Sequence, residues 1–160
     1  MPPITAVLHT ENDALRLGRA LETLYPCDSI LVIDHGSRDA TVRVAHEYGA
    51  RVVSAKTGAP PTHYLPSAAP GWILCLDPRE SVTESLAAGL FEWKLLPVET
   101  LAAPAFSVFL REETVNGWID IPAAATRLVP WTWDRWEGRL PLSESSAIAL
   151  EGELLRFVLP

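Results

Sequence analysis

The chain has 160 residues, 48% apolar and 21% charged, a balance typical of a globular protein with a single domain. Its net charge of −7 argues against a general nucleic-acid or anionic-membrane surface, because such partners recruit clustered Lys and Arg, and no run of these residues occurs. The two cysteines are expected to be reduced thiols, and no apolar stretch reaches the ~20 residues of a membrane span, so we expect a soluble cytoplasmic protein without a transmembrane segment.

The first half of the chain alternates strand-like apolar runs with helical periodicity. This rhythm predicts βαβ units in a parallel sheet, with strands at 4–9, 29–34, 50–55 and 71–77 and helices at 13–24 and 40–48. Thr10 and Asp13 have the spacing of a capping box at the start of the first helix. Gly49 is expected to end the second helix in a left-handed conformation.

Polar loops follow three of the predicted strands, at residues 9–12, 34–39 and 77–80. Ligands of open α/β sheets collect at the carboxyl ends of the strands, so these loops are expected to face one crevice. Residues 56–71 contain four prolines and little periodicity, which predicts a long loop, a candidate lid, with one short helical turn.

The second half changes character. A third helix is expected to start after Thr83, a good cap, and to end before Pro97. Beyond it, two strand-like runs flank Asn116-Gly117, which is a strong hairpin signal, and the remaining residues are best interpreted as further β structure. The sequence therefore predicts an α/β fold with a mostly parallel central sheet and a small C-terminal β region.

Three segments together resemble one known family: ITAVLHTENDALRLGRALETL, ILVIDHGSRDATVRVAHEYGARVV and GWILCLDPRE. In order and spacing they are similar to the family 2 glycosyltransferases of GT-A fold, particularly small bacterial members of the lipopolysaccharide-core type. The resemblance implies a Rossmann-like three-layer sandwich in a single domain, residues 1–160. Residues 1–95 would form its nucleotide-binding half and residues 96–160 its β-rich acceptor side.

The resemblance also implies an activity, the inverting transfer of a sugar from a nucleotide-diphospho-sugar, UDP-type by expectation, to an acceptor hydroxyl. The residues it assigns to the donor are Thr10, Asn12, Asp34, Gly36, Asp77 and Arg79. Mg²⁺ or Mn²⁺ would be held by Asp77 and Glu80, because paired carboxylates can bind an ion that neutralises the leaving diphosphate. Turn and helix-cap chemistry is the competing interpretation for Asp34 and Asp39, and it is the stronger one for Asp39.

The sequence departs from the family pattern inside this proposed site. Arg79 stands where the second Asp of Asp-x-Asp belongs, and it opposes metal binding. Its guanidinium would either bind a diphosphate directly or pair with Glu80 at the surface. His35 replaces a Ser and Glu11 a basic residue, and Glu144, a catalytic candidate with Asp77, lacks the neighbouring His of the family's Val-His-Glu segment.

Three functions stay open at this point. The leading one is a glycosyltransferase, and its rival is a catalytically silent GT-A-like module that binds a nucleotide, a sugar or a protein. A regulator of receiver type fits the strand–helix rhythm but leaves the Trp-rich β region without a role. Within that region, Trp131, Trp133 and Trp136 would either stack on a sugar ring or straddle core and surface.

Overall fold

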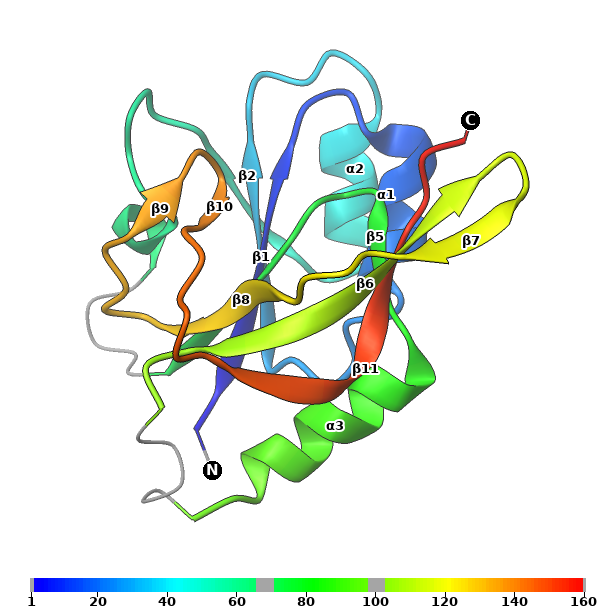
Figure 1. The fold of residues 1–160 in the computed structure, drawn as a ribbon. Coiled ribbons are helices and arrows are strands. Elements are labelled where there is room, and N and C mark those ends of the chain that lie inside the picture. The colour runs from blue at the N-terminus through cyan, green and yellow to red at the C-terminus, as the bar shows by residue number, and fades with distance from the viewer. Residues whose placement is uncertain (1, 66–70, 98–102, 160) are drawn as a thin grey trace.

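A computed structural model describes residues 2–65, 71–97 and 103–159 (Figure 1). The strands are β1 (Ile4–Thr10), β2 (Ser29–Asp34), β3 (Arg51–Ser54), β4 (Trp72–Leu76), β5 (Glu80–Val82), β6 (Phe106–Thr114), β7 (Gly117–Asp120), β8 (Ala125–Pro130), β9 (Trp136–Glu137), β10 (Leu140–Pro141) and β11 (Ile148–Arg156). The helices are α1 (Ala14–Leu21), α2 (Thr41–Glu47) and α3 (Glu84–Lys94), with one 3₁₀ helix, η1 (Pro61–Tyr64).

Most elements predicted from periodicity are confirmed. Gly49 has φ +79° after α2, and the side chain of Thr83 accepts a hydrogen bond from the backbone N–H of Leu86 in α3. The predicted β6–β7 hairpin forms, with Val115 and Asn116 as its turn and Gly117 as the first residue of β7. The predicted capping box is wrong: Asp13 makes no side-chain cap, and Thr10 instead donates its hydroxyl to Asp34. The predicted lid at 56–71 contains η1, and its residues 66–70 lie outside the described part of the chain.

The central sheet is mixed, so the prediction of a mostly parallel sheet is wrong. Its strand order is β3-β2-β1-β4-β8-β6-β11-β5, with β7 paired to β6. Strands β3, β2, β1 and β4 are parallel to one another, as are β6 and β11, whereas β8, β5 and β7 pair antiparallel to their neighbours. Apolar runs identify strands but carry no information on direction, and a hairpin such as β6–β7 reverses the chain.

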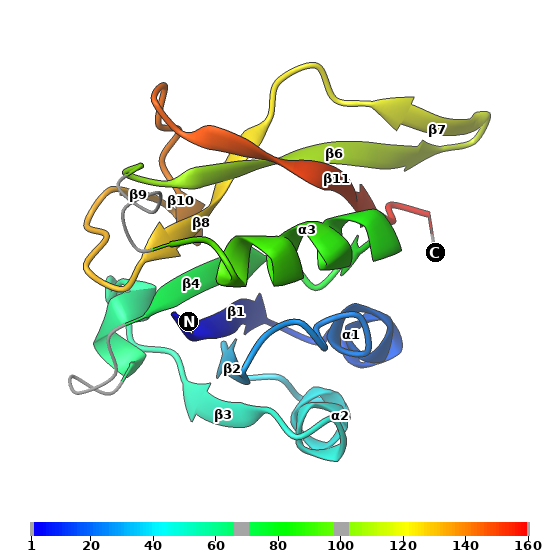
Figure 2. The ribbon, with the colours of Figure 1, turned by 90° about the horizontal axis from the view of Figure 1, so that it is seen from below.

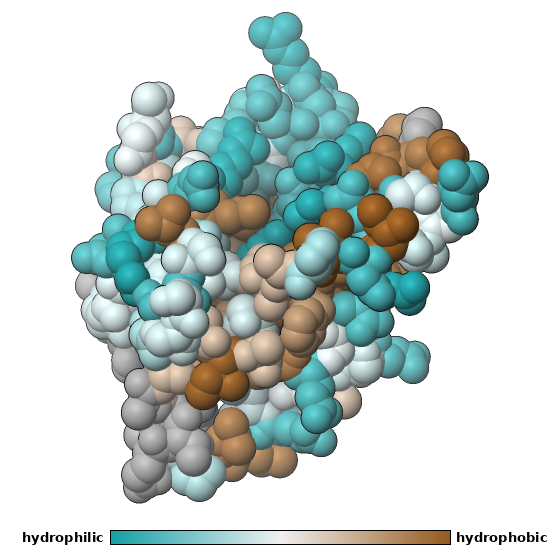
Figure 3. Space-filling model, viewed as in Figure 1, coloured by the Kyte–Doolittle hydropathy of each residue, from teal (hydrophilic) through white to brown (hydrophobic). Residues whose placement is uncertain are grey.

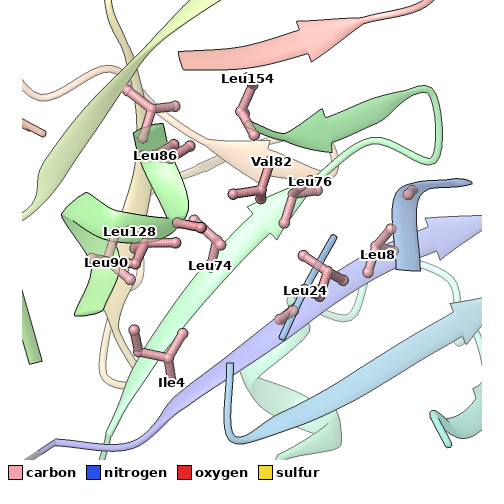
Figure 4. Packing of buried hydrophobic residues seen from close by; sticks show 14 of the residues in the cluster. Ile4, Leu8, Leu24, Leu74, Leu76, Val82, Leu86, Leu90, Leu128 and Leu154 are labelled. Atoms are coloured by element: carbon pink, nitrogen blue, oxygen red, sulfur yellow. The ribbon is translucent and has the colours of Figure 1, made fainter. Parts of the chain in front are cut away.

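The sheet curls around α3, and all three α-helices lie on its inner face (Figure 2). Alternation along β1 shows the two faces, because Ile4 and Leu8 join the core under the helices and Val7 points to the other side. That inner core is packed with leucines from strands and helices (Figure 4).

The outer face of the parallel strands is covered differently. In the described residues the layer over it consists of η1 and the β9–β10 hairpin, so the third layer of the expected sandwich is not made of α-helices. The packing against this face is largely aromatic, from Tyr64 of η1, Trp136 of β9 and Trp133 in the segment before β9. No helix in the described ranges is long and apolar enough to cross a membrane.

One glycine determines how closely α3 approaches β11. The β6–β11 register shifts between Ala149 and Glu153, and Gly152 in this irregular stretch has φ +93°. A Cβ atom there would lie 2.3 Å from the backbone nitrogen of Leu86, in the first turn of α3. Only a residue without a side chain fits this contact.

We therefore expect Gly152→Ala to destabilise the fold by about 2–5 kcal/mol, the sum of left-handed backbone strain and the clash with α3. Gly49→Ala is the matched control, since Gly49 is also left-handed but has nothing within 4 Å of its Cβ position, and it should cost only about 1–2 kcal/mol. Urea unfolding followed by tryptophan fluorescence measures both. Equal losses would contradict a close α3–β11 contact.

Candidate functional site

Two hollows open at the carboxyl ends of the parallel strands. The first, of about 1020 Å³, lies beyond β2 and β3 and is lined by Asp34, His35, Gly36 and residues 54–60 among others. The second, of about 430 Å³, lies beyond β4 and is lined by Glu11, Asp77 and Arg79 among others. His9 and Arg139 line both, so the two hollows adjoin, and we refer to them together as the cleft. The end of the molecule where β1 and β2 stop is largely hydrophilic (Figure 3).

Asp34 ends β2 with its carboxylate held in place. Oδ1 accepts hydrogen bonds from the hydroxyls of Thr10 at 2.8 Å and Ser37 at 2.6 Å, and Oδ2 accepts from the Ser37 backbone N–H at 2.9 Å. Burial works to raise the pKa of Asp34, but these donors outweigh it and keep the pKa below its usual value. Asp34 therefore makes turn contacts and still presents a fixed negative charge to the first hollow.

Thr10 and Asn12 support Asp34 rather than line the cleft. Thr10 is fully buried beneath the carboxylate, and Asn12 joins the first polar loop to the second: its N–H donates to Ser37, and its Oδ1 accepts from the backbone of Arg38. Gly36, with φ +80°, does line the first hollow.

The helix-cap interpretation is confirmed for Asp39. Its carboxylate accepts from the backbone N–H groups of Ala14 and Thr41, which begin α1 and α2. One side chain thus satisfies donors at the starts of both helices.

The stretch that follows β4 forms a tight turn around Asp77. Oδ1 of Asp77 accepts from both the backbone N–H and Nε of Arg79, each at 2.9 Å, and Arg79 Nη2 lies 3.4 Å from Oδ2. Burial again works to raise the pKa of Asp77, and the hydrogen bonds and charge of Arg79 lower it further than burial raises it. Arg79 thus pairs with Asp77, and of the two sequence alternatives its surface pairing with Glu80 is not found.

Glu80 is fully buried between two arginines. Its Oε1 accepts from Arg127 Nη1 at 2.6 Å and from the backbone N–H of Asp77 at 2.8 Å, and its Oε2 accepts from Arg127 Nη2 at 2.9 Å and Arg156 Nη2 at 3.0 Å. Burial raises the pKa of this carboxyl group, but Arg127 first, then the Asp77 N–H and Arg156, hold it below the usual value. We call Glu80, Arg127 and Arg156 the buried charge triad.

These contacts bear directly on the metal ion that the sequence resemblance implies. Both oxygens of Glu80 are used by the triad, and the carboxylate of Asp77 is engaged by Arg79. Among the described residues, no three His, Cys, Asp or Glu side chains are grouped so that they could hold a metal ion. The residues present therefore do not fit Mg²⁺ or Mn²⁺ in this arrangement.

Glu144, the other catalytic candidate, lies outside the lining of both hollows. Its carboxylate accepts from the hydroxyl of Ser146 at 2.7 Å and lies 2.6 Å from Arg135 Nη1. The Ser146 hydrogen bonds, followed by Arg135, lower the pKa of Glu144, which weakens it as a proton acceptor.

A histidine pair lies at the cleft, with His9 lining both hollows and His35 the first. His9 Nδ1 and His35 Nε2 are 2.8 Å apart, so one ring donates to the other. Burial, then the proximity of His35 and Arg139, lowers the pKa of His9 to about 4, and burial and Arg139 lower that of His35. The lowered pKa values favour the neutral form of both rings, with the N–H of one donating to the unprotonated nitrogen of the other.

The cleft also contains cations that the sequence did not single out. Arg139, on the β9–β10 turn, is half-exposed and only loosely paired, with its Nη2 4.0 Å from Glu11 Oε2. Lys56 lines the first hollow, and within the described ranges its ammonium group has no ion-pair partner. Carboxylates nevertheless outnumber guanidinium groups in the second hollow, which is lined by Glu11, Asp13, Asp77 and Glu137 against Arg79 and Arg139.

No protein-family model matches the chain, and no curated protein is similar to it in sequence. Among solved structures, a fragment of S. aureus TarS, residues 1–349, aligns with a TM-score of 0.52 at 18% identity, covering 76% of this chain and 38% of the fragment. Glucosyl-3-phosphoglycerate synthase from Mycobacterium tuberculosis, in complex with Mn²⁺, UDP and glucosyl-3-phosphoglycerate, aligns with a TM-score of 0.42 at 17% identity, over 69% of this chain and 43% of the synthase.

The TarS alignment shows that this chain shares its α/β fold with part of that fragment. The chain spans about two fifths of the TarS fragment, and at this level of identity the likeness concerns the fold alone.

The buried charge triad gives a prediction for stability. Glu80→Gln leaves the buried Arg127 guanidinium without its counter-charge and Arg156 with Glu112 alone, so it should destabilise the protein by about 3–5 kcal/mol at pH 7. Glu47→Gln, which removes an exposed ion pair 3.8 Å from Arg43, should change stability by no more than about 0.5 kcal/mol.

The pH dependence provides a second measurement on the same variants. A carboxyl group whose pKa is lowered in the folded state stabilises the protein above its unfolded pKa, about 4.3 for Glu, and loses that contribution as the pH falls through the folded value. The gap in urea midpoint between wild type and Glu80→Gln should therefore narrow below about pH 4. A gap that stays constant down to pH 2 would show that the charge of Glu80 is not the stabilising feature.

Proposed function

We propose that this chain is a GT-A-type module that binds a nucleotide-diphospho-sugar in the cleft and transfers the sugar, with inversion, to an acceptor hydroxyl. The observation that carries the proposal is the charged Asp34 carboxylate, fixed at the end of β2 in a hollow that continues past Arg139 to Asp77. A carboxylate in this position can accept a hydrogen bond from the N–H of a base or from a ribose hydroxyl. The resemblance favours a UDP-type donor and a small bacterial, lipopolysaccharide-core type of enzyme.

We assign different parts of the donor to the two hollows. The base would lie in the first hollow against Asp34 and Gly36, and the diphosphate would cross the junction near Arg139, within reach of Lys56 and Arg79. Arginine suits this task because its planar guanidinium donates two parallel hydrogen bonds to phosphate oxygens. Within a single module, residues 1–95 would provide most of the nucleotide side and residues 96–160 the acceptor side.

Inverting transfer needs a base for the acceptor hydroxyl. Of the two proposed carboxylates, Asp77 lines the second hollow, whereas Glu144 does not. Asp77 is therefore the base that the geometry favours, although its lowered pKa limits its strength at neutral pH.

A second candidate function is a catalytically silent GT-A-like module. The specific observation in its favour is that Asp77 and Glu80 are both occupied by arginines and that carboxylates predominate in the second hollow. A diphosphate without a counter-ion meets electrostatic repulsion there. Such a module would bind a less charged ligand or a protein.

Calorimetric titration with UDP, GDP and dTDP, each with Mn²⁺ and each with EDTA, separates the two functions. We expect UDP to bind with similar affinity in both conditions, because the guanidinium and ammonium groups of the cleft, and not a metal ion, face the diphosphate. Failure of all three nucleotides to bind would favour the silent module. Binding that disappears in EDTA would show that Asp77 and Arg79 separate to admit an ion.

Variants of Arg79 test the part of the cleft that departs most from the family pattern. Arg79→Ala should weaken UDP binding by about 1–3 kcal/mol, the range for a charge-assisted hydrogen bond. Arg43→Ala, which removes a side chain on α2 that lines neither hollow, should leave binding unchanged. Arg79→Asp should make binding dependent on Mn²⁺. If Arg79→Ala binds UDP like the wild type, Arg79 serves only to hold Asp77.

A further inference from the structure

A third hollow, of about 530 Å³, lies between η1 and residues 131–136 on the outer face of the sheet. We call it the tryptophan groove. Its lining alternates aromatic and polar side chains, from Pro60, Thr62, His63, Trp131, Thr132, Trp133, Asp134 and Trp136. Three indoles thus come from a single six-residue stretch.

The three tryptophans differ in burial: Trp133 is buried and anchors the segment, whereas Trp131 and Trp136 are half-buried. Trp133 is only 6% exposed, packs into the outer core, donates its Nε1 to the Arg135 carbonyl at 2.6 Å, and is covered by the Arg135 guanidinium at 4.3 Å from the ring centre. Trp136 donates its Nε1 to the Trp133 carbonyl at 3.1 Å, which fixes its ring beside the anchor. Trp131 and Trp136 are half-buried, so each keeps part of its ring for the groove.

Polar groups surround these rings without internal partners. Within the described residues, the side chains of Thr62, Thr132 and Asp134 make no hydrogen bond or ion pair. The only charged side chain in the groove's lining as described is the Asp134 carboxylate, apart from the titratable His63. An anionic polymer would be repelled there, whereas a neutral ligand rich in hydroxyl groups would find both acceptors and donors.

A sugar ring is the ligand that matches both the aromatic rings and the unpaired polar groups of the groove. A pyranose offers an apolar C–H face that can lie flat on an indole, and its hydroxyls lie at the ring edge, where a carboxylate can accept two of them. Trp131 and Trp136 both pack against the outer core, and Trp136 also donates to the backbone, so little ordering entropy is lost on binding. We propose that the tryptophan groove is a binding site for a neutral saccharide, which stacks on Trp131 and Trp136 and hydrogen-bonds to Asp134.

The groove is distinct from the proposed donor site but continuous with it. Pro60, Asp134 and Trp136 line both the groove and the first hollow, so a saccharide of more than one unit could extend along this wall. Trp131 and Thr132 belong to the groove and not to either hollow of the cleft. Substitution of Trp131 therefore separates saccharide binding from nucleotide binding.

The test is a glycan microarray probed with the fluorescently labelled chain, followed by titration of the strongest neutral glycan. We expect the wild type to bind at least one neutral glycan and Trp131→Ala to weaken that binding at least tenfold, with Trp131→Phe restoring part of it. Asp134→Asn, at an exposed position that should not disturb folding, should also weaken it several-fold. Trp118→Ala, on β7 away from the groove, is the matched control and should bind within twofold of wild type.

Two results would overturn the proposal. One is an array without a neutral glycan that binds, and the other is glycan binding that Trp131→Ala and Asp134→Asn leave unchanged. A decaproline peptide is titrated in parallel, because aromatic grooves also take extended proline-rich chains. If the peptide binds in a Trp131-dependent way and glycans do not, the groove is a peptide site. UDP titration of Trp131→Ala should match wild type, so a failed saccharide test and a failed donor proposal remain distinguishable.

Discussion

The buried charge triad is the interaction on which the rest of the structure depends. Glu80 begins β5, Arg127 lies in β8 and Arg156 ends β11, so one carboxylate ties together strands from both halves of the chain. Arg127 Nη1 also donates to the carbonyl of Cys75, in β4. Because a buried charge is tolerated only with its partners in place, these strands must assemble together. Their assembly fixes where β4 ends and where the turn around Asp77 begins.

The same interaction determines what the cleft can offer a ligand. In the family pattern two carboxylates at this turn would be available to a cation, but here one faces inward and the other is held by Arg79. The positive charge of the site is therefore supplied by side chains on other elements, Lys56 after β3 and Arg139 on the β9–β10 turn. The carboxylates at the turn after β4 are thus held by arginines, and further cations of the cleft come from other parts of the chain.

Local pattern predicted the first four strands and all three helices, because periodicity, caps and turn glycines act within a few residues of the feature they specify. It did not predict β5, since three residues beside a charged turn carry no periodic signal. It predicted the β6–β7 hairpin and further β structure, but not that β8 and β5 join the central sheet in antiparallel orientation. The site was found in part. Asp34 and Asp77 follow strands and could be located, whereas the role of Arg139 depends on a hairpin more than 100 residues from His9. The predicted capping box does not form because the hydroxyl of Thr10 donates to the buried carboxylate of Asp34. A buried carboxylate without a hydrogen-bond donor would cost more free energy than an uncapped N–H at the start of a helix.

The placement of β11 has a consequence for how this protein is made. Residues near 150 insert between β6 and β5, which precede them by about 40 and 70 residues, so both strands keep an unpaired edge until the ribosome has delivered β11. Unpaired edges are templates for association with other chains. Until Arg156 has been synthesised, Glu80 also lacks one of its two arginine partners and can pair only with Arg127. The nascent chain therefore carries an aggregation hazard until β11 has been made, because its parallel half is then complete while β6 and β5 still have open edges.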